Sequence, residues 1–226
     1  MKPMIISLKN VDDRAYPPQK KSLLMVEHMF KLRKKYQFFM RADDDVYVKI
    51  NKLKGFLRSL NSTKPVLMGQ SGGFGGNTEY LALGDSEGFE NFDNYCMGGP
   101  GVIFSYKLLE KFGGKVRSCL KDHILTYHED VELSRCVYKW TGVSCLSGLD
   151  GKDYFYQNYL ENGGNLKKST ISRDRLGICN ALTLHPNKDG NGMRKMDFYF
   201  KYRMFFLKLY FWVKHGHFRP FLGQKK

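Results

Sequence analysis

Short apolar runs alternate with stretches of helical periodicity along this chain. Residues 22–36 place apolar side chains on one side at helical spacing, which predicts an amphipathic helix. Further helices are predicted where apolar residues recur in the same way, over 51–60, 105–112 and 129–140. Between the helices, short apolar runs are typical of strands, at 37–40, 46–48, 66–68 and 102–104.

The expected helix starts follow from residues with capping side chains. Asn51 and Ser105 each stand at the beginning of a periodic segment, and their side-chain oxygens suit the free N–H groups of a first helical turn. Because strands alternate with helices and no internal repeat is present, we predict an α/β layered fold.

Two segments depart from this alternation. Residues 70–94 are rich in glycine and acidic side chains and have no periodicity, which predicts a long loop of the kind that often serves as a functional lid. Residues 193–213 have a helical pattern crowded with aromatic rings between lysines and arginines. We expect a terminal helix that docks its rings on the core. Contact with a membrane surface or a partner protein is the alternative.

Composition indicates a globular protein with a strong basic bias. The 226 residues most simply form one domain, and 42% hydrophobic with 26% charged residues argues against a disordered or coiled-coil chain. The net charge of +15 favours polyanionic or phosphate-bearing partners. Ten of the lysines and arginines fall in 187–226, against two aspartates. Nucleic acid is disfavoured as the partner, because no recognised nucleic-acid-binding module accompanies the basic segment.

Targeting and cysteine signals do not decide the cellular compartment of the protein. No run of about 18 apolar residues and no signal-peptide pattern is present, so the protein is cytosolic or a targeting segment is missing from the chain. The five cysteines form no C-x-x-C pair, which weakens zinc and thioredoxin interpretations. Asn61 begins an Asn-Ser-Thr glycosylation sequon, which would suit a secreted or lumenal protein.

The acidic triplet Asp43-Asp44-Asp45 is the first candidate for chemistry. A bare triplet is ordinarily a solvated turn, but this one directly follows a buried strand, where α/β sheets place their ligands. Carboxylate oxygens there suit Mn²⁺ or Mg²⁺, which complete their shells with substrate phosphates. His185 is the best-placed further ligand, because it ends an apolar strand before Pro186, and an imidazole shifts preference toward Mn²⁺.

A carboxylate and a glycine cluster complete the candidate chemistry. Glu129 and Asp130 begin a predicted helix, where a carboxylate serves either as a cap or as a rigidly held general base. Gly98 and Gly99 allow backbone to approach a ligand closely. The other glycine cluster, at 72–76, lacks the ending of a phosphate-binding P-loop and is interpreted as flexible loop.

Four ordered motifs resemble one enzyme family. Residues 39–47 (FMRADDDVY), 96–102 (CMGGPGV), 128–132 (HEDVE) and 183–188 (TLHPNK) are similar to the β1,3-glycosyltransferases of family 31. Within that family, they most resemble the N-terminal domain of the chondroitin sulfate synthases. The resemblance covers about residues 5–190, so we expect a catalytic domain over 1–190 and a basic aromatic tail over 191–226.

The resemblance implies a GT-A fold, a Rossmann-like mixed sheet flanked by helices, here expected without its first strand and helix. It also implies a UDP-sugar donor, Mn²⁺ and inversion at the anomeric carbon. Asp45 and His185 would bind the metal, and Asp43 and Asp44 would contact the donor nucleotide or the metal shell. Asp130 would be the base, with Glu129 the weaker choice. The segment Gly98–Gly99 would line a sugar.

The resemblance further implies transfer of glucuronic acid to the 3-hydroxyl of N-acetylgalactosamine in a chondroitin chain. The location would be the Golgi lumen, with a membrane anchor in the full-length protein, and another chondroitin synthase subunit would be a possible partner. Disulfides become plausible among Cys96, Cys119, Cys136 and Cys145. Two alternatives stay open, a core 1 type β1,3-galactosyltransferase and a non-catalytic subunit that assists polymerisation.

Overall fold

The structure is a computed structural model. It describes residues 6–9, 11–12, 14–16, 18–73, 94–121, 127–149, 152–158 and 175–203. Within these ranges, helices and small mixed sheets form an α/β arrangement, as the sequence predicted. No helix in the described residues is long and apolar enough to cross a membrane. The middle of the predicted 70–94 loop and the end of the predicted 193–213 helix lie outside the described residues.

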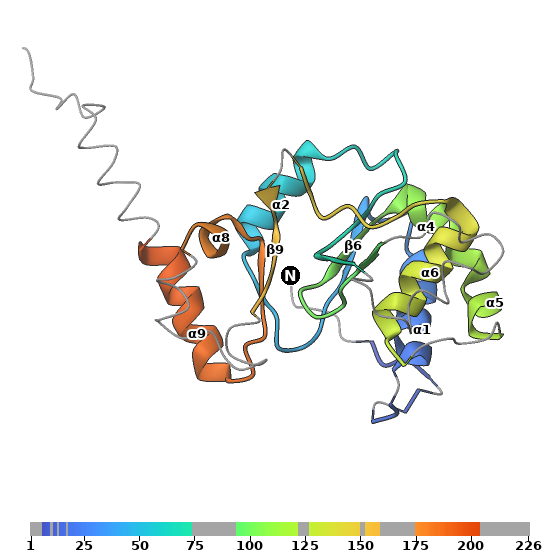
Figure 1. Ribbon diagram of the computed structural model, residues 1–226, viewed down its shortest axis with the longest axis horizontal. Coiled ribbons are helices and arrows are strands. Elements are labelled where there is room, and N and C mark those ends of the chain that lie inside the picture. The colour runs from blue at the N-terminus through green and yellow to red at the C-terminus, as the bar shows by residue number, and fades with distance from the viewer. Residues whose placement is uncertain are drawn as a thin grey trace, which may run out of the picture.

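A three-stranded antiparallel sheet lies at the centre of the fold (Figure 1). Its strands, in spatial order, are β1 (Phe38–Arg41), β6 (Val102–Ser105) and β3 (Leu67–Met68). Phe104 of β6 lies opposite Leu67 of β3. All four residues of β6 are buried, because both faces of this strand are covered.

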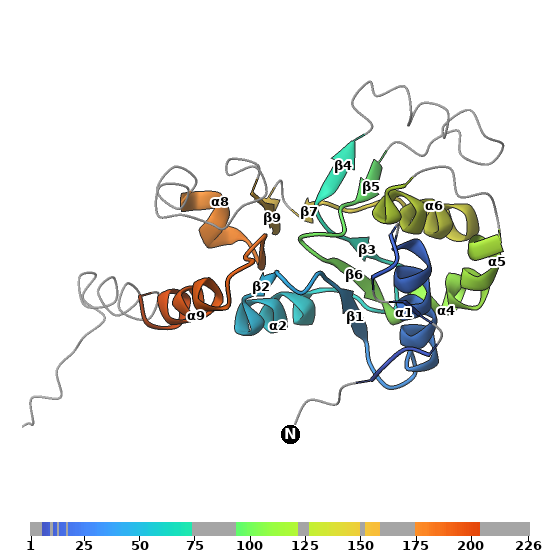
Figure 2. The same cartoon turned by 90° about the horizontal axis from the view of Figure 1, so that it is seen from below.

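Four helices gather on one side of this sheet (Figure 2). They are α1 (Gln19–Lys31), α4 (Tyr106–Phe112), α5 (Val116–Lys121) and α6 (Glu129–Thr141), with a short 3-10 turn at Gly113–Lys115 between α4 and α5. Their apolar side chains pack around Phe104 in the main core. The Ser105 hydroxyl accepts a hydrogen bond from Leu108 N at 3.1 Å, which confirms the predicted cap of α4.

On the other side of the sheet lie α2 (Ile50–Ser59) and a second sheet. Its order is β2 (Tyr47–Val48), β10 (Thr183–His185) and β9 (Phe155–Gln157), with β10 antiparallel to β2 and parallel to β9. Ile103 packs on this side with Leu53 and Phe155. The chain passes directly from β1 in the first sheet to β2 in the second, so residues 42–46 stand at the junction of the two sheets.

Two short pairs of strands and two further helices complete the described elements. They are β4 (Ser71–Gly73) with β5 (Asn94–Cys96), β7 (Gly148–Leu149) with β8 (Lys152–Asp153), α8 (Arg175–Asn180), and α9 (Gly190–Phe198) with its π-helical extension Tyr199–Arg203. In this extension, the ring of Phe200 stacks on Tyr47 at 5.7 Å between centroids, whereas Tyr202 and, at the end of α9, Phe198 are exposed. The expected docking of aromatic rings on the core is therefore seen on one side of this segment.

The structure corrects three predicted boundaries. The first helix spans 19–31 rather than 22–36, because the chain turns at Leu32. Asn51 is not an N-cap, since α2 already begins at Ile50 and its cap position is Lys49. The predicted loop at 70–94 is strand at both ends, because residues 71–73 pair with residues 94–96.

Candidate metal and base site

The acidic triplet and His185 meet at the junction of the two sheets. Asp45 Oδ1 lies 3.1 Å from His185 Nε2, and Asp43 Oδ2 lies 3.9 Å from the same nitrogen. One possible ligand atom from each of the three residues falls within 4.8 Å of the others. Asp44 is exposed and lines an adjoining pocket together with Asp45, Asn187 and Lys188. The sequence prediction that Asp45 and His185 lie together is therefore matched by the geometry.

The cluster has the chemistry that a divalent cation requires. Asp45 Oδ1 is buried and has no hydrogen-bond partner among the described residues, although the imidazole is near. Burial lowers the pKa of His185, while Asp45 and Asp43 oppose this shift, so the ring is neutral at neutral pH. Two carboxylates and a neutral imidazole are a donor set that suits Mn²⁺. The three residues present therefore fit a metal of this class.

Backbone contacts fix the position of this cluster. The Asp45 carbonyl accepts a hydrogen bond from Asn187 N at 2.7 Å, which ties the triplet to the segment after β10. His185 Nδ1 lies 2.7 Å from Gln157 Oε1 on the neighbouring strand. Gly99 lies against the ring, because a Cβ at this position would come within 2.6 Å of His185 Cε1. Only a glycine leaves room for the imidazole here.

A buried arginine connects the metal cluster to α6. Arg41, at the end of β1, is 7% exposed and forms ion pairs with Glu129 and with Asp43, the latter at 3.1 Å. Burial raises the pKa of Glu129, while the Arg41 guanidinium opposes that shift. Glu129 is engaged in this ion pair. Its carboxylate is therefore tied to the Arg41 guanidinium.

Asp130 lies in the first turn of α6 and is held by two backbone N–H groups. Its Oδ2 accepts a hydrogen bond from Gly98 N at 3.1 Å, and its Oδ1 accepts one from Val131 N at 3.0 Å. The side chain remains partly exposed. A carboxylate held in this way by backbone N–H groups keeps further lone pairs that can accept a proton.

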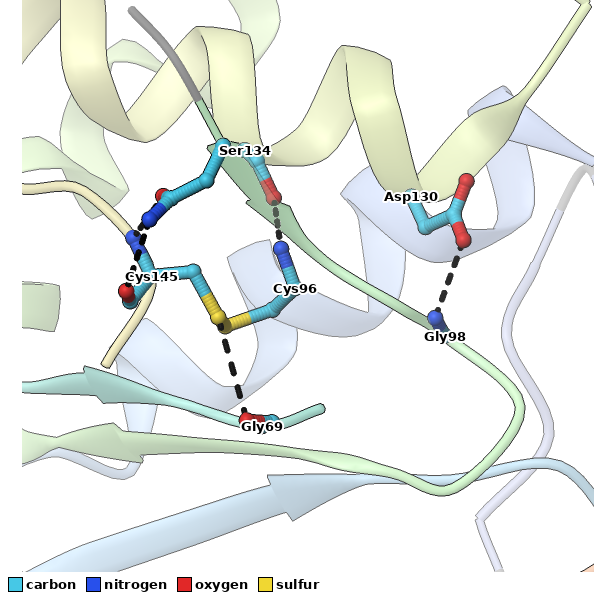
Figure 3. The surroundings of a disulfide bond; sticks show 7 residues. Gly69, Cys96, Gly98, Asp130, Ser134 and Cys145 are labelled. Carbon is cyan, nitrogen blue, oxygen red and sulfur yellow. Dashed lines mark hydrogen bonds between the residues drawn. A yellow bond between two sulfur atoms is a disulfide. The ribbon is translucent and has the colours of Figure 1, made fainter. Parts of the chain in front are cut away.

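A disulfide anchors the segment that carries Gly98 (Figure 3). Cys96 is bonded to Cys145, and Cys96 N donates to the Ser134 hydroxyl of α6 at 3.0 Å. The loop after β5 is therefore tied to α6 at two neighbouring points, Ser134 and Asp130. Gly98 and Gly99 lie between the carboxylate of Asp130 and the ring of His185, because the first contacts Asp130 and the second approaches His185.

The remaining predicted features also have defined surroundings. The second disulfide joins Cys119 to Cys136, and Cys179 is a free thiol, so the four cysteines that the resemblance selected are the bonded ones. Asn61 is exposed in the connection from α2 to β3, outside the metal cluster. Its Oδ1 accepts hydrogen bonds from Thr63 N at 2.9 Å and from the Thr63 hydroxyl at 2.6 Å.

Sequence reasoning missed two residues of this site. Arg41 stands two residues before the acidic triplet. Buried carboxylates need a cation nearby, so this arginine could have been recognised from the sequence. Gln157 had no such signal, because only the parallel pairing of β9 with β10 brings it beside His185.

Comparison with known proteins gives matches over most of the chain. A family model described as galactosyltransferase matches residues 9–145, and one described as chondroitin N-acetylgalactosaminyltransferase matches residues 115–205. Mouse chondroitin sulfate synthase 3 is 46% identical over 186 residues, which are 81% of this chain and 20% of that protein. The human protein of that name is 45% identical over the same shares. Human chondroitin sulfate glucuronyltransferase is 25% identical over 71% of this chain and 18% of its own length. The chain spans about a fifth of the curated relatives that it matches.

Proposed function

This chain belongs to the galactosyltransferase family, glycosyltransferase family 31, and from that premise we propose that it is a metal-dependent hexosyltransferase acting on chondroitin. The reaction would move glucuronic acid from UDP to the 3-hydroxyl of a terminal N-acetylgalactosamine, with inversion. The observation that carries this proposal is the cluster of Asp43, Asp45 and His185, with Asp130 on the other side of the Gly98–Gly99 backbone. The names of the similar synthases and glucuronyltransferase support the choice of acceptor and sugar.

In this proposal Asp45 and His185 hold Mn²⁺, and Asp43 and Asp44 contact the donor nucleotide or the metal shell. The bound ion would neutralise negative charge that builds on the departing diphosphate. Asp43 is held by Arg41, so its carboxylate keeps a fixed direction during turnover. Lys188 stands beside Asp44 and Asp45 in the adjoining pocket and offers a positive charge to a bound anion.

Asp130 is the proposed general base. It would accept the proton of the acceptor hydroxyl while the hydroxyl oxygen bonds to the anomeric carbon. The bond from that carbon to the diphosphate oxygen breaks at the same time, and UDP leaves with the electron pair. The backbone of Gly98 and Gly99 would line the reacting sugar, because glycine allows a ligand to approach the backbone closely.

A panel of UDP-sugars tests this proposal. UDP release is measured with Mn²⁺ or with a chelator, and the acceptor is a chondroitin oligosaccharide that ends in N-acetylgalactosamine. We expect turnover that requires metal and is selective for UDP-glucuronic acid. Selectivity for UDP-galactose would favour the core 1 type activity, and absence of turnover with every donor would favour a non-catalytic subunit that assists another chondroitin synthase.

The base assignment has its own test. Asp130→Asn should lower the rate by several orders of magnitude, while the thermal midpoint stays near that of the parent protein. Asp153→Asn is the matched control, because Asp153 is exposed on β8. An Asp130→Asn protein that keeps its rate would remove Asp130 from the mechanism.

We also propose a location in the Golgi lumen. The disulfides Cys96–Cys145 and Cys119–Cys136 support it, because such bonds persist in oxidising compartments. The exposed sequon at Asn61 supports the same assignment. When the chain is expressed in a secretory pathway, peptide N-glycosidase should reduce its mass, and Asn61→Gln should abolish that change. A chain whose mass does not respond to the glycosidase would argue against modification at Asn61.

A further inference from the structure

The second nitrogen of His185 is in contact with a residue that no motif includes. Gln157 of β9 lies opposite His185 of β10 in parallel register, and its Oε1 is 2.7 Å from His185 Nδ1. An amide oxygen only accepts hydrogen bonds, so the tautomer that satisfies this contact is the one with the proton on Nδ1. Nε2 is then unprotonated, and its lone pair faces Asp45 at 3.1 Å and Asp43 at 3.9 Å.

We propose that Gln157 is a positioning residue that holds His185 in the Nδ1–H tautomer and so presents Nε2 to the divalent cation. Metal-binding histidines generally donate their other ring N–H to an acceptor, which fixes the tautomer and the direction of the ring. The cation is part of the proposed function, and the inference rests on it to that extent. The tautomer of His185 in the metal-free protein can be measured whether or not a cation binds.

The surroundings of the ring limit its positions. Gly99 closes one approach, since even a Cβ there would come within 2.6 Å of His185 Cε1. Asp45 Oδ1 lies near Nε2 but has no hydrogen-bond partner among the described residues, which is the arrangement expected of two groups that share a cation. Gln157 thus contacts the imidazole at Nδ1, and a neutral amide adds no charge to a site with two carboxylates.

Backbone hydrogen bonds between β9 and β10 hold Gln157 beside His185. Asn158 N donates to the His185 carbonyl at 2.8 Å, so the strands are bonded next to the contact itself. Gln157 and His185 therefore remain paired as long as β9 and β10 remain paired. A side chain on a loop would lose this register through local motion.

The first test is the tautomer in metal-free protein, measured by NMR on ¹⁵N-labelled histidine. The His185 signals are assigned by their loss in His185→Ala. We expect the Nδ1–H form in the parent protein and a shift toward the Nε2–H form in Gln157→Leu. Gln157→Glu keeps an acceptor and should retain the Nδ1–H form. An Nε2–H form in the parent protein, or unchanged tautomer populations in Gln157→Leu, would overturn the proposal.

The second test is Mn²⁺ affinity, measured by electron paramagnetic resonance of the free ion. Gln157→Leu should weaken binding about 10- to 100-fold, and Gln157→Glu should restore it. Gln37→Leu is the matched control, because Gln37 is exposed just before β1. Equal affinity in Gln157→Leu and the parent protein would refute the positioning role. A parent protein that binds no Mn²⁺ would refute the metal in the proposed function, while the tautomer would still decide the role of Gln157.

Discussion

Gly98 is the position where the addition of one methyl group should disturb the site most. A Cβ there would lie 2.7 Å from Glu129 Oε1 and still closer to Arg41 Nη1. The two side chains form a buried ion pair, since Arg41 and Glu129 are 8% and 11% exposed. Neither group can retreat into solvent, so Gly98→Ala must either separate the pair or shift the segment that holds Asp130.

The magnitude follows from these two alternatives. Overpacking a close-packed site costs about 1–3 kcal/mol, and breaking a buried ion pair costs about 3–5 kcal/mol. We therefore expect Gly98→Ala to lower the free energy of unfolding by about 3 kcal/mol. For a chain of 226 residues, this corresponds to a fall in the thermal midpoint of roughly 6–12 °C.

Calorimetry and urea titration under non-reducing conditions measure this effect. Gly55→Ala is the control, because its Cβ would meet nothing within 4 Å in helix α2, and it should stabilise by about 0.5–1 kcal/mol. A double-mutant cycle with Arg41→Met isolates the cause: Gly98→Ala should cost at least about 1 kcal/mol less in that background. Equal costs in both backgrounds would refute the steric argument.

Three further predictions concern other parts of the molecule. Burial lowers the pKa of Lys49 to about 7, so above that pH the unfolded chain binds more protons than the folded chain. The free energy of unfolding, measured by urea titration, should therefore rise by roughly 3 kcal/mol from pH 7 to 9.5. The variant Lys49→Met should flatten this rise. Because the pKa of His185 is lowered from 6.5 and the metal binds the neutral ring, Mn²⁺ binding should persist at pH 6.5 and weaken only in more acidic buffer. A calorimetric titration in which half of the Mn²⁺ affinity is already lost above pH 6.5 would contradict this. The disulfide Cys96–Cys145 closes a loop of 49 residues, and Cys119–Cys136 closes one of 17. Each disulfide is removed in turn by replacing both of its cysteines with serine. The stability losses should be about 4 and about 3 kcal/mol, and the reverse order in thermal unfolding would count against the loop-closure argument.

The mixed α/β fold and the residue types of the site could be predicted from the sequence, because both depend on local pattern. The helix at 129–141 and the Ser105 cap follow from neighbouring residues along the chain. The prediction at Asn51 failed for a non-local reason. Lys49 extends its side chain to the Ile178 carbonyl and lies over the Phe200 ring, so the helix starts where that contact places it.

Only the tertiary structure decided how the motifs combine. The sequence determined the acidic triplet, His185 and Asp130 as candidates, since their chemistry and their positions at element ends are local properties. The two-sheet junction, the Arg41 link to Glu129 and the Gln157 contact with His185 depend on strand pairings and packing between distant segments. Such pairings reflect the burial of whole faces and the register of backbone hydrogen bonds, which no single window of sequence contains.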